Sequence, residues 1–305
     1  EPLYLDLAAA VSEAAETGAV PWPAKPRVIG GRYGLSSKEF TPAMAAAVFM
    51  ELAKDAPKRR FTVGIKDDVT GLSLDYDSAF STEDPETTRA VFFGLGADGT
   101  VGANKNTIKI IADRAGLEAQ AYFVYDSKKS GSLTVSHLRF GPRPIRSSYL
   151  IREAGFVACH QENFVDKYDM LSLAGPGAVF LLNTAHPEKA WDALPRELQE
   201  QILLKQLRFY AIDGYKVARE AGLGRRISTV MQAAFFSISG LLPDCEAAVK
   251  ESIVKSFGKK DKELVDKNFR AVEKAAAALV RVALPAQATA SRHRRTELPQ
   301  EAPSY

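Results

Sequence analysis

The sequence predicts an α/β protein whose mostly parallel sheet is covered by helices and is preceded by a small α/β segment. Short runs such as AYFVY at 121–125 and AVFLLN at 178–183 are almost continuously apolar, which is typical of strands buried on both faces. Segments with helical periodicity alternate with these runs, as in folds built from successive strands and helices. The 305 residues, of which 46% are hydrophobic, suffice for one large domain or two smaller ones.

The first part of the chain, residues 1–76, contains the small α/β segment. Residues 3–17 have helical periodicity, and a strand, a glycine turn and a helix are expected between residues 27 and 52. The run FTVGIKDDVTGLSL, which begins at residue 61, is strand-like. The polar and acidic segment 77–88 then predicts a linker between two domains.

Residues 89–283 predict the main α/β domain. Apolar runs predict strands at 89–93, 119–125, 156–160, 178–183 and 208–212. Periodic segments predict helices at 103–115, 188–206, 214–221, 229–239, 244–257 and 261–280. Residues 284–305 have no periodicity and little apolar surface. This pattern predicts a linker or tail that is extended or poorly ordered.

Composition and charge argue against several function classes. The net charge of +3 is too small to indicate nucleic-acid binding, and we interpret the basic cluster at 292–295 as part of a solvated tail. Cys159 and Cys245 form no CxxC pair, which argues against a zinc site or a disulfide framework and favours a cytoplasmic location. No apolar run reaches the roughly 18 residues that span a membrane, and we expect no signal peptide. The chain opens without Met, which suggests a piece of a longer protein.

The pattern G-x-G-x-x-G occurs at Gly94, Gly96 and Gly99, between a predicted strand and a predicted helix. This context is typical of a Rossmann-like sheet, in which a glycine turn and a helix N-terminus bind a diphosphate. Side chains at the start of the helix could add donors or positive charge, namely Thr100, Asn104 and Lys105. A tight turn that packs a helix on a strand, without a ligand, explains the same glycines.

A second candidate segment follows the strand at 119–125. Lys128, Lys129 and Ser130 follow Asp126 with only Ser127 between them, at the end of that strand. Lysines at this position suit a phosphorylated ribose or another polyphosphate, since ligands of open parallel sheets bind beyond the carboxyl ends of the strands. Solvated loop lysines are the alternative interpretation.

Other polar residues indicate structure rather than chemistry. Prolines stiffen the segment 136–146, and its arginines could bind an anion or, as we prefer, form an interface; they are Arg139, Arg143 and Arg146. His137 has no accompanying nucleophile motif, so we expect a structural histidine. Cys159 and His160 cannot both face one side of a strand, and a half-buried cysteine is the interpretation that we adopt.

Several long segments resemble the middle of pyruvate:ferredoxin (flavodoxin) oxidoreductases. The resemblance extends from about Pro26 to about Val282. It rests on FFGLGADGTVGANKNTIKII, AYFVYDSKKSGSLTVSHLRFGPRPIRSSYLI, FVACHQENFVDKYDML, FYAIDGYKVAREAGLGRRISTVMQAAFF and, in the first part of the chain, RYGLSSKEFTPAM with FTVGIKDDVTGLSL. It implies that residues 1–76 are the C-terminal part of a transketolase-C-like second domain, 77–88 a linker, 89–283 a gamma-type domain, and 284–305 a linker or tail.

The resemblance also implies an activity for the full-length protein. Such enzymes convert pyruvate and coenzyme A to acetyl-CoA and CO2, and they pass electrons to ferredoxin or flavodoxin. Thiamine diphosphate, Mg2+ and [4Fe-4S] clusters would be bound by domains outside this chain, which alone would be inactive. A homodimer is implied for the full-length enzyme, with no membrane or nucleic-acid partner.

The resemblance implies that the gamma-type domain helps to bring coenzyme A to the thiamine centre. Carried over by motif position, the coenzyme-binding residues would be Gly94, Gly96, Asp98, Gly99, Thr100, Asn104, Lys105, Lys128, Lys129 and Ser130. No catalytic or metal-binding residue is expected in this chain. Two alternatives stay open, a non-catalytic structural or interface module and an NADP-binding Rossmann reductase.

Overall fold

The computed structural model describes residues 2–34, 38–65, 69–125, 133–258 and 261–294. The chain forms two compact units. Unit 1 comprises residues 1–84 and 147–149, and unit 2 comprises residues 85–146 and 150–305. Unit 1 therefore ends inside the segment 77–88 that we predict as a linker.

Unit 1 is built on a small parallel sheet with the strand order β1-β2-β3. The strands are β1 (Gly30–Tyr33), β2 (Arg60–Val63) and β3 (Ser73–Leu74). Helix α2 (Pro42–Leu52) begins after Thr41, whose hydroxyl accepts a hydrogen bond from the Met44 N–H in the manner of an N-cap. The small core of this unit comprises Met44, Phe61, Val63 and Leu74.

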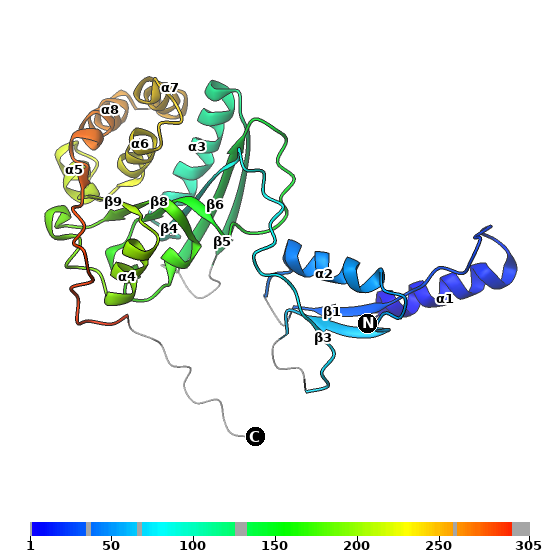
Figure 1. Cartoon of the computed structure of the whole chain (residues 1–305). Coiled ribbons are helices and arrows are strands. Elements are labelled where there is room, and N and C mark those ends of the chain that lie inside the picture. The colour runs from blue at the N-terminus through cyan, green and yellow to red at the C-terminus, as the bar shows by residue number, and fades with distance from the viewer. Residues whose placement is uncertain (1, 35–37, 66–68, 126–132, 259–260, 295–305) are drawn as a thin grey trace. The chain divides into compact units, whose positions relative to one another are not determined.

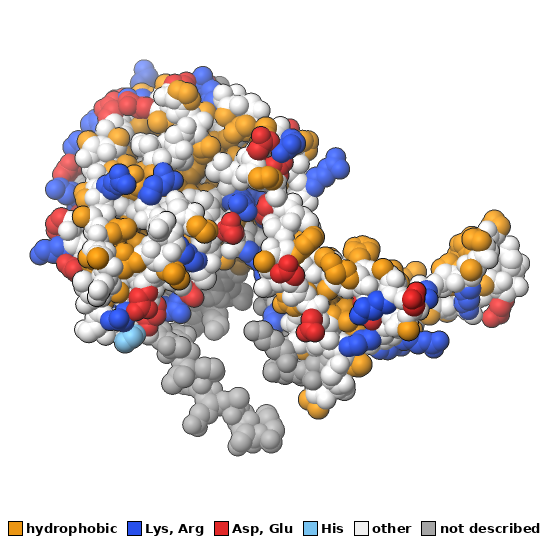
Figure 2. All heavy atoms as spheres, viewed as in Figure 1, with side chains coloured by type: hydrophobic (Ala, Val, Ile, Leu, Met, Phe, Trp, Pro, Cys, Tyr) orange, Lys and Arg blue, Asp and Glu red, His pale blue; other side chains and the backbone are white. Residues whose placement is uncertain are grey.

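Helix α1 (Pro2–Thr17) of unit 1 confirms the helix expected at 3–17, but none of its residues is buried. Figure 2 shows hydrophobic side chains gathered over α1 and α2. The large apolar side chains exposed on these two helices are Leu3, Leu5, Leu7, Phe49, Met50 and Leu52. Over the visible face of unit 2, by contrast, side chains of both charges are interspersed (Figure 2).

Unit 2 contains a seven-stranded sheet with the order β10-β9-β8-β7-β4-β6-β5. Figure 1 labels β9, β8, β4, β6 and β5 of this sheet. Its strands are β4 (Thr88–Leu95), β5 (Glu118–Tyr125), β6 (Leu133–Gly141), β7 (Ala154–Cys159), β8 (Ala174–Asn183), β9 (Arg208–Ile212) and β10 (Val280–Arg281). The four central strands β9, β8, β7 and β4 are parallel. Antiparallel pairs flank them, with β10 beside β9, β6 beside β4, and β5 beside β6. The predicted α/β fold with a mainly parallel central sheet is confirmed.

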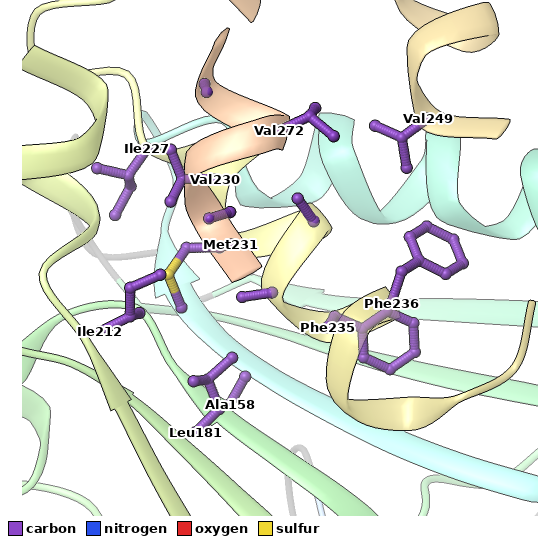
Figure 3. Packing of buried hydrophobic residues seen from close by; sticks show 14 of the residues in the cluster. Ala158, Leu181, Ile212, Ile227, Val230, Met231, Phe235, Phe236, Val249 and Val272 are labelled. Atoms are coloured by element: carbon purple, nitrogen blue, oxygen red, sulfur yellow. The ribbon is translucent and has the colours of Figure 1, made fainter. Parts of the chain in front are cut away.

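One face of this sheet, which we call the helical face, is covered by five α-helices (Figure 1). They are α3 (Thr100–Ala115), α5 (Gly214–Glu220), α6 (Ser228–Ser239), α7 (Cys245–Phe257) and α8 (Lys262–Ala277). Figure 3 shows Ala158, Leu181 and Ile212 of the strands beneath α6, with side chains of α7 and α8 above it. Helix α6 is therefore the central helix of this core, as its apolar sequence predicts.

The opposite face is covered by short elements and one α-helix. These are the 3₁₀ helices η1 (Glu162–Phe164), η2 (Met170–Leu173) and η3 (Pro187–Lys189), and the helix α4 (Arg196–Leu204). The continuous helix predicted at 188–206 is wrong. Pro195 disfavours helical backbone in the residue before it, and α4 begins directly after this proline.

Strand β6 corrects a second expectation, since we interpret the segment from residue 136 as a rigid loop. Residues 133–141 instead form a buried strand between β4 and β5. Thr134, Ser136, His137 and Arg139 interrupt its apolar pattern, which explains why periodicity does not reveal it. Arg139 is 1% exposed, so the interpretation of this arginine as an interface or anion-binding residue is wrong.

The segment after β10 is extended and docked. The Val282 N–H donates to the Phe209 carbonyl at 2.9 Å, and residues 283–294, which we call the strap, then follow without helix or strand. The expectation of an extended segment is confirmed for these residues. Arg292 and His293 are exposed, in agreement with a solvated cluster, but Arg292, His293 and Arg294 each also pair with an acidic side chain of unit 2, which the sequence did not predict. Arg295 lies outside the described residues.

Candidate functional site

Among the predicted site residues that the structure describes, Gly94 to Thr100 lie at the carboxyl end of β4 in the unit 2 sheet. After β4 the chain passes through α3 to β5 on one side of β4, whereas β7 lies on the other side. The order of strands therefore reverses between β4 and β7. In open α/β sheets, ligands bind beyond the carboxyl ends of the strands at such a switch point. This topology is the reason to consider the residues after β4, β7, β8 and β9 together.

The glycine turn, residues 94–100, connects β4 to α3. A Cβ on Gly94 would lie 2.5 Å from the Thr100 Oγ1, so only glycine lets the helix approach the strand this closely. Gly99 has a φ of +82° and stands at the N-cap of α3, a conformation that favours glycine. Gly96 lies in the turn between them. Close packing therefore explains the glycine at position 94, and backbone conformation explains the glycine at position 99.

Asp98 occupies the N-terminus of α3 with its own carboxylate. Its Oδ1 accepts the Thr100 N–H at 2.9 Å, and its Oδ2 accepts the Leu95 N–H at 2.8 Å. A negative charge at this position is favourable because the helix dipole is positive here. The backbone donors that a phosphate would use are thus partly satisfied within the turn.

Side-chain hydrogen bonds connect Asp98 to residues that follow β7 and β9. The Gln161 Nε2, just after β7, donates to the Asp98 Oδ2 at 3.3 Å. The Tyr215 hydroxyl, just after β9, donates to the Gln161 Oε1 at 3.2 Å. Sequence reasoning missed Gln161, and the available signal was a polar side chain directly after an apolar strand.

Asn183, at the end of β8, fastens the same edge through its amide. Its Nδ2 donates to the His160 carbonyl at 3.0 Å, and its Oδ1 accepts the Gly214 N–H at 2.8 Å. Asn183 is buried, so both ends of the amide act within the fold. This residue was also missed from sequence.

His160 is a buried, neutral partner of the glycine turn. Its Nδ1 lies 2.7 Å from the Thr100 Oγ1. Burial lowers the pKa of His160 to about 4, although the charge of Asp98 acts to raise it. The adjacent Cys159 faces the other side of the sheet, and burial raises the pKa of its thiol to about 12. Cys159 is fully buried rather than half-buried as expected, and this pKa makes the thiol unreactive.

Asn104 points into the protein instead of toward the turn surface. It follows Thr100 by one helical turn on α3 and is 3% exposed. Within the described residues, four buried side-chain atoms of α3, β6 and the residue after β7 have no hydrogen-bond partner. We call this set the polar layer, and it comprises Asn104 Nδ2, Thr134 Oγ1, Ser136 Oγ and His160 Nε2. Buried atoms of this kind are usually satisfied by internal water.

Lys105 lies apart from the glycine turn. Its side chain is exposed, and its Nζ is 5.5 Å from the centre of the Phe123 ring on β5. Lys128, Lys129 and Ser130 lie outside the described residues. Strands β4 and β5 are both antiparallel to β6, so their carboxyl ends reach the same edge with β6 between them.

His137 is a structural histidine, as expected. Its Nδ1 accepts the Ile151 N–H at 3.2 Å, which requires an unprotonated Nδ1. Burial, and then the charge of Arg139, lower the pKa of His137 to about 4. The Arg139 guanidinium donates to the Gln120 Oε1 at 3.3 Å on β5. Both residues therefore act within the sheet.

Among the described residues, no group of three or more His, Cys, Asp or Glu side chains is placed to hold a metal ion. No helix in this part of the chain has the length and apolar character that crossing a membrane requires. A pocket of about 420 Å³ lies near the carboxyl ends of β8 and β9, and its charged lining residues are Glu188, Asp213, Lys216, Glu220 and Lys274.

Comparisons with known proteins agree with the resemblance described from sequence. The family model for pyruvate ferredoxin/flavodoxin oxidoreductase matches residues 89–278. A pyruvate-flavodoxin oxidoreductase of Rhodospirillum rubrum is 54% identical over 288 residues, which cover 93% of this chain and 24% of the relative. The chain thus spans about a quarter of the length of the curated relatives it matches.

Two solved structures share the fold. The PORC subunit of pyruvate oxidoreductase from Thermotoga maritima aligns with a TM-score of 0.53 and 17% identity, over 64% of this chain and 98% of the subunit. A 2-oxoglutarate:ferredoxin oxidoreductase from Magnetococcus marinus aligns with a TM-score of 0.51 and 21% identity, over 66% of this chain and 34% of that chain. At these identities the likeness concerns the fold alone. The extent of the family match and the identity to the curated relatives together establish that the chain belongs to the pyruvate ferredoxin/flavodoxin oxidoreductase family.

Proposed function

We propose that this chain is an internal part of an enzyme that oxidatively decarboxylates pyruvate. The enzyme forms acetyl-CoA and CO2 from pyruvate and coenzyme A, and it passes the released electrons to ferredoxin or flavodoxin. Support comes from the family match and from the 54% identity to a pyruvate-flavodoxin oxidoreductase. Since the chain spans about a quarter of such relatives, the reaction requires further parts of the longer protein.

Thiamine diphosphate, Mg2+ and [4Fe-4S] clusters do not fit the residues that the structure describes. An iron–sulfur cluster needs several thiolates, whereas Cys159 is buried and Cys245 lies on α7 of the helical face. The described residues also offer no group of acidic or histidine side chains that could hold a metal ion. We assign these cofactors to other parts of the enzyme and derive no step through them.

For this chain we propose a role in placing coenzyme A. The observation that carries this proposal is the position of the glycine turn at the point where the strand order reverses. The 2-oxoglutarate:ferredoxin oxidoreductase from Magnetococcus marinus, which shares the fold, was solved with 2-oxoglutarate, coenzyme A and succinyl-CoA bound, and we propose the same ligand class, coenzyme A, for this chain.

The residues of the proposed coenzyme site would act in different ways. Lys128, Lys129 and Ser130 would supply charge and donors to a phosphate. Gly96 and Gly99 would let a ligand approach the backbone of the turn. Thr100 and Asn104 are buried, so they would shape the turn from inside rather than touch the ligand. The carboxylate of Asp98 would repel a diphosphate placed directly on the α3 N-terminus.

The test uses the full-length enzyme and its KM for coenzyme A. If the lysines bind the 3′-phosphate, the double variant Lys128→Ala/Lys129→Ala should raise this KM about tenfold or more. The same variant should leave the KM for dephospho-coenzyme A unchanged. Lys109→Ala, a change of one exposed lysine on α3, is the matched control.

The variant Asp98→Asn tests whether a phosphate of coenzyme A lies close to the glycine turn. Asparagine keeps the capping oxygen and removes the charge, so it should lower the KM for coenzyme A if the diphosphate lies nearby. An unchanged KM in every one of these variants would contradict coenzyme placement by these loops.

A second candidate function is a structural module that joins neighbouring domains or subunits. The observation in its favour is that the Asp98 carboxylate already accepts two backbone N–H groups of the turn and is itself held by the Gln161 amide. On this proposal Gly94 and Gly99 only allow close packing of α3. The unchanged coenzyme A kinetics described above would favour it.

Further partners of the enzyme follow from the same proposal. The longer protein would act in the cytoplasm as a homodimer, and ferredoxin or flavodoxin would dock on parts outside this chain. Size-exclusion chromatography with light scattering of the full-length enzyme tests the dimer. A monomeric mass with full activity would contradict it.

A further inference from the structure

The strap, residues 283–294, is held by a glutamine that is completely buried. Gln199 of α4 is 0% exposed, and its Oε1 accepts two successive backbone N–H groups of the strap. The distances are 2.8 Å from Thr289 N and 2.9 Å from Ala290 N. Its Nε2 donates to the Trp191 carbonyl at 2.9 Å, which fixes the orientation of the amide. A single side chain thus recognises extended backbone.

Further hydrogen bonds fix the register of the strap. The Trp191 Nε1 donates to the Thr289 Oγ1 at 2.9 Å, which selects a hydroxyl at this position. The Arg196 N–H donates to the Arg292 carbonyl at 2.9 Å. Register is therefore set at both ends of the stretch Thr289–Arg292.

Three acidic side chains meet the basic end of the strap. Asp166 pairs with Arg292, and Asp169 lies 3.2 Å from the Arg294 guanidinium. The Glu197 carboxylate contacts the His293 Nδ1 at 2.8 Å and accepts the Arg294 N–H at 2.9 Å. Burial acts to raise the pKa of Glu197, but the hydrogen bonds to its carboxylate outweigh this and lower it to about 2. The surface is negatively charged where the strap is positively charged.

No residue of the strap is itself buried, whereas Gln199 and Trp191 beneath it are. Detachment of the strap would therefore expose little apolar surface of its own. Segments held mainly by hydrogen bonds and exposed ion pairs open at low free-energy cost. The receiving surface, in contrast, belongs to α4 and the core of the opposite face.

We propose that Trp191, Gln199, Glu197, Asp166 and Asp169 form a peptide-binding groove that recognises an extended basic segment, and that the strap is its reversibly bound ligand in the same chain. The recognised pattern is a hydroxyl residue whose own N–H and the N–H of the next residue can both donate, followed by a basic stretch, as in Thr289–Arg294. This interaction is separate from the coenzyme proposal and uses none of its residues.

Limited trypsin digestion of the 305-residue chain tests the groove, with the cleavage of the Arg292–His293 bond followed by mass spectrometry. In the wild type this bond should be cut slowly, since both residues are engaged. Gln199→Leu should accelerate the cleavage about tenfold or more, because two buried hydrogen bonds to the strap are lost. Gln232→Leu is the matched control. It removes another buried glutamine, which bonds to the Ala103 carbonyl and Thr107, and it should leave the rate unchanged.

Ala290→Pro removes one N–H of the strap and changes no residue of the groove. It therefore tests the same contact if Gln199→Leu does not fold. It should also accelerate cleavage, whereas Ala290→Ser, which retains the N–H, should not. Hydrogen exchange of the Thr289 amide supplies a second readout and should speed up in parallel. Wild-type cleavage and exchange rates in Ala290→Pro would overturn the proposal.

Discussion

The two faces of the unit 2 sheet are covered by different kinds of structure. On the helical face, α6 places Phe235 against Phe156 at 4.9 Å and against Phe92 at 5.2 Å between ring centres. On the opposite face, three short 3₁₀ helices and α4 cover the sheet, and the strap is bound to α4 and to Trp191. The first face depends on apolar side chains that meet across long helices. The second also has an apolar core, in which Phe180 stacks on Phe209 at 5.1 Å, but its outermost segment, the strap, is held by backbone hydrogen bonds to the buried Gln199.

Because of this difference, a lost contact should destabilise the two faces to a different extent. Loss of an aromatic ring should damage the helical face throughout, because one cavity affects every element that packs around it. Loss of a polar contact should act locally on the opposite face. The following four predictions test this contrast, in order of decreasing effect.

The largest effect is expected for Phe235→Ala on α6. Phe235 is 1% exposed and contacts four other phenylalanine rings. Removal of a buried aromatic side chain costs about 3–5 kcal/mol of the free energy of unfolding. Urea denaturation of the 305-residue chain measures it, with Leu204→Ala on the exposed side of α4 as control. A loss below about 1 kcal/mol would contradict the central role of α6.

Acid should weaken both faces through one buried histidine on each. His160 lies against Phe92 of the helical face, and His137 pairs in register with Val91 of the opposite face. Both have a pKa near 4 in the folded protein, below the ordinary value of 6.5. The unfolded chain therefore binds more protons between pH 6.5 and 4, and stability falls as the pH is lowered through this window.

By pH 4 each histidine should cost at most about 3 kcal/mol of the free energy of unfolding. Denaturation between pH 7 and pH 4 measures the loss, and the single variants His137→Gln and His160→Gln should each flatten the profile. A profile that neither variant changes would show that these histidines do not remain neutral in the folded protein.

An intermediate effect is expected for Gly94→Ala in the glycine turn. The new Cβ would meet the Thr100 side chain at 2.5 Å, so α3 or the turn must shift. Overpacking of this kind costs about 1–3 kcal/mol. A double-mutant cycle with Thr100→Ala checks the cause, since a smaller residue at position 100 should recover part of the loss. Strict additivity of the two changes would place the strain elsewhere.

The smallest effect is expected for Asp98→Ala, which removes the capping carboxylate of α3. Loss of an N-terminal cap costs about 1 kcal/mol. Asp98→Asn should lose less, because its single oxygen can still accept the Thr100 N–H, although the Leu95 N–H loses its acceptor. Thermal unfolding of both variants measures the difference. If both variants unfold at the wild-type temperature, the carboxylate does not stabilise the turn.

The helical face was largely predictable from sequence because its elements repeat apolar residues at helical or strand spacing. The helices at 214–221, 229–239 and 244–257 are found within one residue of α5, α6 and α7 at each end. The opposite face was less predictable. Helix α4 is shortened by Pro195, and the strap is held by partners about ninety residues away in the chain. Long-range polar partners leave no periodic signal.

The candidate site divides in the same way. The turn between β4 and α3 was located correctly, since three glycines between a strand and a helix are a local signal. The buried orientation of Asn104 was not, because it depends on which side of α3 meets the sheet. Strand β6 was missed since Ser136, His137 and Arg139 are polar yet buried. The coenzyme role of Lys128 and Lys129 stays a prediction.

The strand order also has a consequence for the time course of synthesis. Strands β4, β5 and β6 and helix α3 lie within residues 88–141, whereas β7, which covers the other edge of β4, begins at Ala154. At about 5–20 residues per second, the ribosome needs roughly 8–30 s to go from residue 141 to residue 294. At the start of this interval, the backbone N–H and C=O groups on the β7 side of β4 have no partner strand. Free strand edges of this kind promote aggregation. We expect ribosome-bound chains arrested at residue 141 to recruit chaperones more strongly than chains arrested at residue 294, which cross-linking would measure.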